Sequence, residues 1–193
     1  NRGNQYVWVP VGNGIKKNDG TTVDITLGRY SFANGTSDKD SNGTLLAKGT
    51  PILQQNSENY TQEVLINSQY KELSMSRTGV LSSGVNGLNT TALNLKGFVD
   101  SVKANGGYYI ARYEASYGTD GKANSKVSNT YGTSSVNKEG QLWNSLLQLN
   151  AANASRGLYT TMTSDLINSY AWDTAIVYIQ NFSGDTDYSY QNL

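Results

Sequence analysis

The sequence predicts one α+β domain spanning residues 1–193. Aromatic and β-branched residues fill two short runs, 6–11 and 108–113, a composition that is typical of strands. Apolar residues recur at helical spacing within 93–105 and 164–179, which predicts two amphipathic helices. A chain of this length buries about 70% of its unfolded surface when it folds, which is enough to build one hydrophobic core.

The N-terminal part is predicted to consist of strands joined by tight turns. The run 6–11 predicts a core strand, and the Asn-Asp-Gly sequence at 18–20 predicts a turn. That turn would join 15–17 and 21–27 in a hairpin, and 28–32 continues the strand pattern.

Three stretches are predicted to be long loops. Residues 34–50 are rich in Gly, Asn, Ser and Asp and show no period, and 117–140 are similarly polar. Residues 51–92 have only weak periodicity. A connection of that length inside one domain is unusual unless it is functional or packs over the core.

The C-terminal half is predicted to contain three helices. The first ends at Gly106, after an apolar face made of Leu95, Phe98, Val99 and Val102. The second covers 150–159 despite Gly157. The third begins with Ser164 as its N-cap and Asp165 in its first turn.

Composition excludes several kinds of chemistry. The chain has no cysteine and no histidine, so these residues hold no disulfide, no thiolate nucleophile, no Cys/His zinc site and no imidazole base. The formal net charge is zero and no basic cluster occurs, which argues against nucleic acid as a partner. No apolar run is long enough for this segment to insert into a membrane.

Four segments carry a resemblance to a known family. They are the opening strand 6–10, the aromatic strand 108–115 with its Arg-Tyr-Glu triplet, the stretch 143–159, and the Trp-Asp helix around 170–175. In this order they resemble the formylglycine-generating-enzyme-like (sulfatase-modifying-factor) branch of the C-type lectin fold. The chain is similar to Asn/Ser-rich, non-enzymatic members from gut Firmicutes and their phages. The resemblance implies a C-type-lectin-like α+β fold, or only its N-terminal part.

The chain departs from this family at its C-terminal end. Members continue into a Gly-Asn-Val-Trp-Glu-Trp-like motif, an Arg-Gly-Gly strand and a closing Phe-Arg strand, and the copper-binding cysteines of the true enzymes belong to that part. None of these motifs occurs in the 193 residues. We therefore expect that the protein is cut, that the rest lies elsewhere, or that the fold closes differently. An N-terminal signal or anchor is expected to have preceded the strand at 6–11.

Several conspicuous residues are predicted to be structural. Arg112 and Glu114 could pair a carboxylate-binding Arg with a general acid, but a buried framework ion pair under aromatic neighbours is the stronger interpretation. Asp173 is predicted to bond backbone or an arginine, while Trp172 fills the core. The other framework candidates are Trp8 and Trp143.

Ligand-binding and metal-binding candidates lie in polar loops. Tyrosine among Ser, Gly and Asn is typical of recognition surfaces, and the expected exposed tyrosines are Tyr117, Tyr131, Tyr188 and Tyr190. The alternative is that most tyrosines pack in the core with the hydroxyl at its rim. Asp185 and Asp187 are candidate ligands for a structural calcium ion, with a solvated turn as the alternative, and no other cofactor is expected.

These observations predict a non-enzymatic protein of the cell surface or the virion. It would use loops on a rigid scaffold to bind a surface ligand or to adhere. The first alternative is a structural subunit that packs against copies of itself in an extracellular filament. The second is a formylglycine-generating-type oxidase whose catalytic half lies outside these residues.

Overall fold

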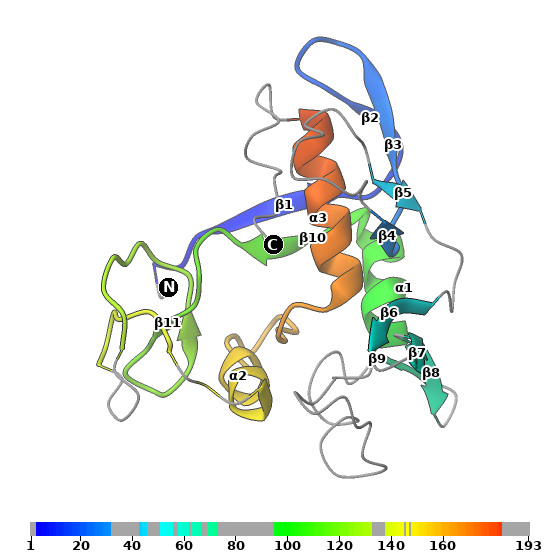
Figure 1. Cartoon of the computed structure of the whole chain (residues 1–193). Coiled ribbons are helices and arrows are strands. Elements are labelled where there is room, and N and C mark those ends of the chain that lie inside the picture. Colours follow the sequence, from blue (N-terminus) through cyan, green and yellow to red (C-terminus); the bar gives the residue numbers. More distant parts are fainter. Residues whose placement is uncertain are drawn as a thin grey trace.

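The computed structural model describes residues 3–31, 43–45, 51–55, 58–61, 63–66, 69–72, 95–132, 138–144, 146 and 148–182. Within these residues, helices and small antiparallel sheets occur together, which confirms the α+β class (Figure 1). Each sheet described has two strands. Such small sheets need packing against other elements to be stable.

The central sheet joins the two aromatic runs. Strand β1 (Tyr6–Pro10) pairs antiparallel with β10 (Gly107–Ala111), in a register that places Val9 opposite Tyr108. These two side chains form the core with Val102 of helix α1 (Leu95–Asn105) and with Ala171 and Ala175 of helix α3 (Ser169–Phe182). The prediction that strands occupy both aromatic runs is therefore confirmed.

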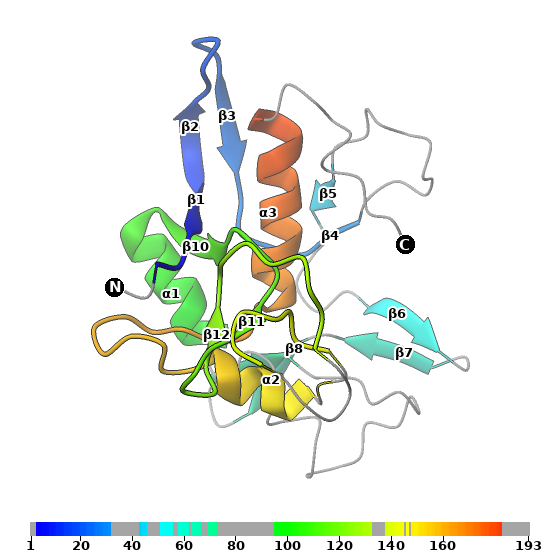
Figure 2. The ribbon, with the colours of Figure 1, turned by 90° about the vertical axis from the view of Figure 1, so that its left-hand side faces the viewer.

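A hairpin extends from the central sheet. Strand β2 (Gly12–Lys16) follows β1 and pairs with β3 (Thr22–Ile25), as the turn at 18–20 predicts. The Asp19 carboxylate accepts hydrogen bonds from the Thr21 N–H at 2.9 Å and from its hydroxyl at 2.6 Å, which stabilises this turn. The hairpin projects well beyond the central sheet, on the side where α3 ends (Figures 1 and 2).

Short strands occupy stretches that were predicted to be loops. Strand β5 (Thr44–Leu45) lies inside the expected loop 34–50, most of which is outside the described residues, and it pairs with β4 (Tyr30–Ser31). Strand β4 itself falls within 28–32, where the strand pattern was predicted to continue. Strand β11 (Ser116–Tyr117) pairs with β12 (Ala123–Asn124), inside the expected loop 117–140.

The prediction of a long loop over 51–92 is wrong for its first part. Strands β6 (Pro51–Gln55) and β7 (Glu58–Thr61) form one hairpin, and β8 (Glu63–Ile66) and β9 (Gln69–Glu72) form another. Consecutive strands pair through backbone hydrogen bonds across a short turn, so they need no apolar alternation. The rest of the stretch, residues 73–92, lies outside the described residues.

Two helices follow the sequence pattern, one of them with a different end. Helix α1 (Leu95–Asn105) stops at Gly106, whose φ of 72° is readily adopted by glycine. Helix α2 (Gln148–Ser155) ends before Gly157, at φ 65°, and does not continue to residue 159 as predicted. The glycine ends this helix instead of being tolerated within it.

The last helix, α3 (Ser169–Phe182), begins five residues later than its predicted N-cap residue. Asn168 is the N-cap, because its side chain accepts a hydrogen bond from the Ala171 N–H at 2.9 Å. The Ser164 hydroxyl instead accepts from the Leu158 N–H, and Asp165 pairs with Arg156 at 2.8 Å. Both predicted capping residues are thus engaged by the loop that precedes the helix.

Two buried tyrosines are expected to make the fold less stable at alkaline pH. The Tyr108 hydroxyl donates to the Ala171 carbonyl, and burial, with a smaller effect of Asp173, raises the pKa of Tyr108 far above 10.0. Burial also raises the pKa of Tyr30, whose hydroxyl donates to the Thr26 carbonyl at 2.6 Å.

We expect the free energy of unfolding to fall above about pH 10. Below that pH both states keep the phenolic protons, whereas above it the unfolded chain loses them and the folded chain retains them. Each of Tyr30 and Tyr108 then lowers the stability by up to about 1.4 kcal/mol per pH unit. Urea unfolding at a series of pH values from about 7 to about 11 measures how steeply the free energy of unfolding falls with pH. The slope should decrease in Tyr108→Phe, and an unchanged slope in that variant would contradict the assignment.

Candidate functional site

The outer face of the β1–β10 sheet presents two aromatic side chains to solvent. Because side chains alternate along a strand, Trp8 and Tyr109 point away from the core that Val9 and Tyr108 enter. Trp8 and Tyr109 are directly opposite one another, and their rings meet edge to face with centroids 4.9 Å apart. Trp8 is 37% exposed and Tyr109 is 64% exposed.

Gly107 allows Trp8 to lie close against the sheet. A Cβ atom at residue 107 would lie 2.5 Å from Cζ2 of Trp8 and would also collide with the Val9 carbonyl. The Trp8 ring therefore packs over Gly107, at the place where a side chain would otherwise stand. This packing holds one ring in place beside the more exposed ring of Tyr109.

A third and a fourth ring extend this face toward the N-terminus. Tyr6 lies on the same side of β1 as Trp8, and its ring contacts Tyr159 edge to face at 6.2 Å. The Tyr159 hydroxyl donates to that of Tyr6 at 3.4 Å and accepts from the Asn4 amide at 3.2 Å. We call Asn4, Tyr6, Trp8, Tyr109 and Tyr159 the aromatic strip.

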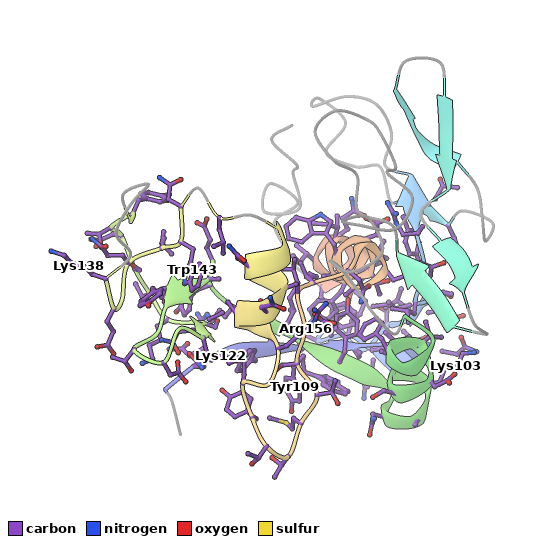
Figure 3. The ribbon with its side chains drawn as sticks, turned by 90° about the horizontal axis from the view of Figure 1, so that it is seen from below. Lys103, Tyr109, Lys122, Lys138, Trp143 and Arg156 are labelled. Atoms are coloured by element: carbon purple, nitrogen blue, oxygen red, sulfur yellow. The ribbon has the colours of Figure 1, made fainter. Side chains whose placement is uncertain are left out.

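The loop that carries Tyr159 is fixed at both ends. Arg156 pairs with Asp165, and Lys122 donates to the Arg156 carbonyl at 2.7 Å. In the view from below, Lys122 and Arg156 are labelled next to α2, where this loop begins, and Tyr109 is labelled on β10 (Figure 3). The strip is therefore made by three segments far apart in the sequence.

The aromatic strip combines apolar rings with neutral polar groups. None of its five residues carries a charge at neutral pH. Tyr and Trp offer a broad apolar surface together with a hydroxyl or an indole N–H, and Asn4 adds an amide. Such a surface suits a ligand that has both apolar faces and hydroxyl groups.

The tryptophans do not all occupy the predicted core positions. Trp172 is 47% exposed on α3, so the prediction that it fills the core is wrong; its neighbours Ala171 and Asp173 take the buried positions. Trp8 belongs to the exposed strip. Trp143 is half-buried and packs against Tyr117, with ring centroids 5.2 Å apart.

Arg112 and Glu114 do not form the predicted buried ion pair. Strand β10 ends at Ala111, and both side chains are exposed. Arg112 donates to the Gln5 side chain at 3.1 Å and lies over the Tyr113 ring, 5.4 Å from its centroid. The chain leaves the strand before the two residues can share one of its faces.

Asp173 behaves as the sequence predicts. Its Oδ2 atom accepts a hydrogen bond from Arg29 Nε at 2.6 Å and another from the Tyr30 N–H at 2.9 Å. The next residue, Thr174, accepts from the Gly28 N–H at 3.2 Å. Helix α3 is thereby held to the segment 28–30, and these buried polar groups serve the framework.

The two predicted recognition tyrosines that the structure describes do not belong to the strip. Tyr117 and Tyr131 both lie next to the segment 138–144, where Tyr117 donates its N–H to Gln141 and Tyr131 bridges to Leu142. Tyr117 is half-buried and Tyr131 is 61% exposed. The other two candidate tyrosines, Tyr188 and Tyr190, lie outside the described residues.

The proposed calcium ligands Asp185 and Asp187 also lie outside the described residues. In the part of the chain that the structure describes, no group of three or more acidic side chains is placed to hold a metal ion. None of the described helices is long and apolar enough to cross a membrane.

Comparison with known proteins identifies no relative of this chain. The chain matches no family model, no curated protein and no solved structure. The aromatic strip is therefore interpreted from its own geometry and chemistry.

Proposed function

We propose that this chain is a non-catalytic binding module of an extracellular surface, and that the aromatic strip binds a neutral glycan. The main supporting observation is the pair of exposed rings, Trp8 and Tyr109, in a strip whose five residues are all uncharged at neutral pH. The module would be displayed on a cell or a virion and would support recognition or adhesion. Its scaffold would be C-type-lectin-like.

The chemistry of sugars supports this choice of ligand. A pyranose ring exposes C–H groups on its faces and hydroxyl groups around its edge. The faces stack on aromatic rings, and the hydroxyls bond to amides and phenols. The strip provides both kinds of contact, from Trp8 and Tyr109 at one end to Tyr159 and Asn4 at the other.

Preorganisation also supports binding at this place. Trp8 is seated over Gly107, and Tyr159 is held by two hydrogen-bonding neighbours. Rings that are already ordered lose little conformational entropy when a ligand stacks on them. Exposed aromatic side chains gathered on one face are typical of interaction sites.

Trp8→Ala is expected to weaken binding to a neutral glycan about fivefold to thirtyfold, because aromatic contacts of this kind contribute roughly 1–2 kcal/mol. The test is an array of neutral and acidic glycans, followed by calorimetry with the best neutral oligosaccharide. Binding should change little with salt, since no ion pair is involved.

Trp172→Ala is the matched control, because it removes an exposed tryptophan from α3, outside the strip. It should bind the oligosaccharide like the unchanged chain. Absence of binding to every neutral glycan would refute the proposed ligand class. Equal losses in the two tryptophan variants would refute the proposed site.

A further inference from the structure

The outer edge of β10 has backbone groups that pair with no other strand among the described residues. The Arg112 N–H bonds to the Gln5 carbonyl and the Val11 N–H bonds to the Gly106 carbonyl, which fixes which residues face β1. By alternation, the residues in between, Gly107, Tyr109 and Ala111, direct their N–H and C=O groups to the other edge. Within the described residues, no backbone hydrogen bond reaches this edge at Tyr109 or Ala111.

This edge lacks the features that usually prevent strand pairing. Strand β10 reads Gly-Tyr-Tyr-Ile-Ala and contains no charged residue and no proline. In contrast, β1 ends in Pro10, and the β2–β3 hairpin carries Lys16 and Asp24. Tyr109 and Ala111 are exposed on this edge, whereas Gly107 is buried. An uncharged edge with an exposed aromatic residue at its centre is a template for another strand.

The outer edge of β10 can pair with the same edge of a second copy of the chain. When two copies of β10 run antiparallel about a two-fold axis at Tyr109, each Tyr109 can exchange two backbone hydrogen bonds with its counterpart. Gly107 of each copy then faces Ala111 of the other, so the same three residues supply both sides of the ladder. No like charges meet, since the paired stretch is uncharged and the net charge of the chain is zero.

We propose that two copies of this chain pair edge to edge through β10. The result is a four-stranded antiparallel sheet in the order β1, β10, β10, β1. A sheet of four strands is more stable than the two-stranded sheet of one chain. The two Tyr109 rings lie directly opposite each other on the outer face, between the two Trp8 rings.

Pairing also has a consequence for the aromatic strip. The two strips become one continuous surface across the two-fold axis, which would lengthen the platform for a glycan. This consequence rests on the proposed function, whereas the pairing itself depends only on the edge. Dimerisation is therefore tested without any ligand.

Sedimentation equilibrium of the whole chain should show a concentration-dependent species of twice the 20.9 kDa chain mass. Tyr109→Lys and Tyr109→Glu should each weaken this dimer at least about tenfold, because they remove an aromatic pair and place like charges opposite each other. An equimolar mixture of the two variants should dimerise again, since lysine then faces glutamate. Tyr131→Lys, at an exposed tyrosine elsewhere, should leave the dimer intact.

Recovery in the mixture separates a lost contact from a damaged fold, because a misfolded variant would not be rescued by another. A monomer at all concentrations would overturn the proposal, as would a dimer that persists in Tyr109→Lys. Hydrogen exchange gives an independent result: the Tyr109 amide should be protected only at high protein concentration. Protection that does not depend on concentration would mean that another strand of the same polypeptide occupies the edge, and would also overturn the proposal.

Discussion

Asp173→Ala is expected to destabilise the fold by about 3–5 kcal/mol, because it leaves the buried Arg29 guanidinium without its partner. The side chains of Arg29 and Asp173 are only 12% and 7% exposed. Arg29 Nη1 already has no hydrogen-bond partner within the described residues, so this atom offers no second hydrogen bond to replace the lost one. The substitution also removes the acceptor of the Tyr30 N–H. Such a loss is a large part of the roughly 5–15 kcal/mol that stabilises a typical domain.

Two further variants separate the charge from the hydrogen bond. Asp173→Asn keeps the volume and an acceptor for the Tyr30 N–H, so it should lose less stability than Asp173→Ala. The double variant Arg29→Met, Asp173→Leu removes both charges and should recover most of the loss. It should still be less stable than the unchanged chain by about 1–2 kcal/mol, since the Tyr30 N–H keeps no acceptor.

Urea denaturation of the four proteins measures these differences. An Asp173→Ala variant within about 1 kcal/mol of the unchanged chain would contradict the role of the pair, since breaking a buried pair costs more than that. So would a double variant as unstable as Asp173→Ala. The first result would mean that water reaches the guanidinium, and the second that packing of α3 dominates.

The sequence correctly predicted the elements that are specified by nearby residues, such as the apolar spacing of a helix or the residues of a tight turn. Helix α1 follows from the spacing of Phe98 and Val102, and its end follows from Gly106. The hairpin β2–β3 follows from the turn at 18–20. In each case the residues that specify the structure lie within one helix or one turn.

Helix boundaries and side-chain contacts that depend on residues far away in the sequence were predicted less accurately than these local elements. Ser164 and Asp165 have the chemistry of an N-cap, but Leu158 and Arg156 engage them, and the helix starts after Asn168. Asp173 was correctly assigned to an arginine or the backbone, yet its actual partners, Arg29 and Tyr30, lie more than 140 positions away in the chain. Sequence spacing alone does not identify such partners.

The candidate site was missed because the strand pattern does not say which face is buried. Trp8 alternates with Val7 and Val9, and it was predicted to be a framework residue of a core strand without the buried face being identified. The structure buries Val9 because α1 and α3 both cover that face, leaving Trp8 and Tyr109 outside. The available signal was Gly107, whose missing side chain makes room for a large ring on the neighbouring strand.

Gly107→Ala is expected to destabilise the fold by about 1–3 kcal/mol, which is the usual cost of adding atoms to a well-packed site. It should also weaken glycan binding as strongly as Trp8→Ala does. The added Cβ would lie 2.5 Å and 2.8 Å from Cζ2 and Cε2 of Trp8. The indole can move away from this contact, but the Val9 carbonyl, which the Cβ would also meet, belongs to the backbone of β1. The substitution therefore both displaces the ring and separates the two central strands.

A double-mutant cycle distinguishes these two effects, because residues in direct contact give non-additive changes in stability. If the indole is the main obstacle, the double variant Trp8→Ala, Gly107→Ala should lose less stability than the sum of the losses in the two single variants. If the Val9 carbonyl dominates, the two losses should add. They should also add if the main cost is the φ of 157° at Gly107, which residues with a side chain rarely adopt. Urea unfolding and oligosaccharide titration on the same four proteins give both readouts. A Gly107→Ala variant that keeps full stability and full binding would show that Trp8 is not seated over Gly107, and the preorganised strip would lose its structural basis.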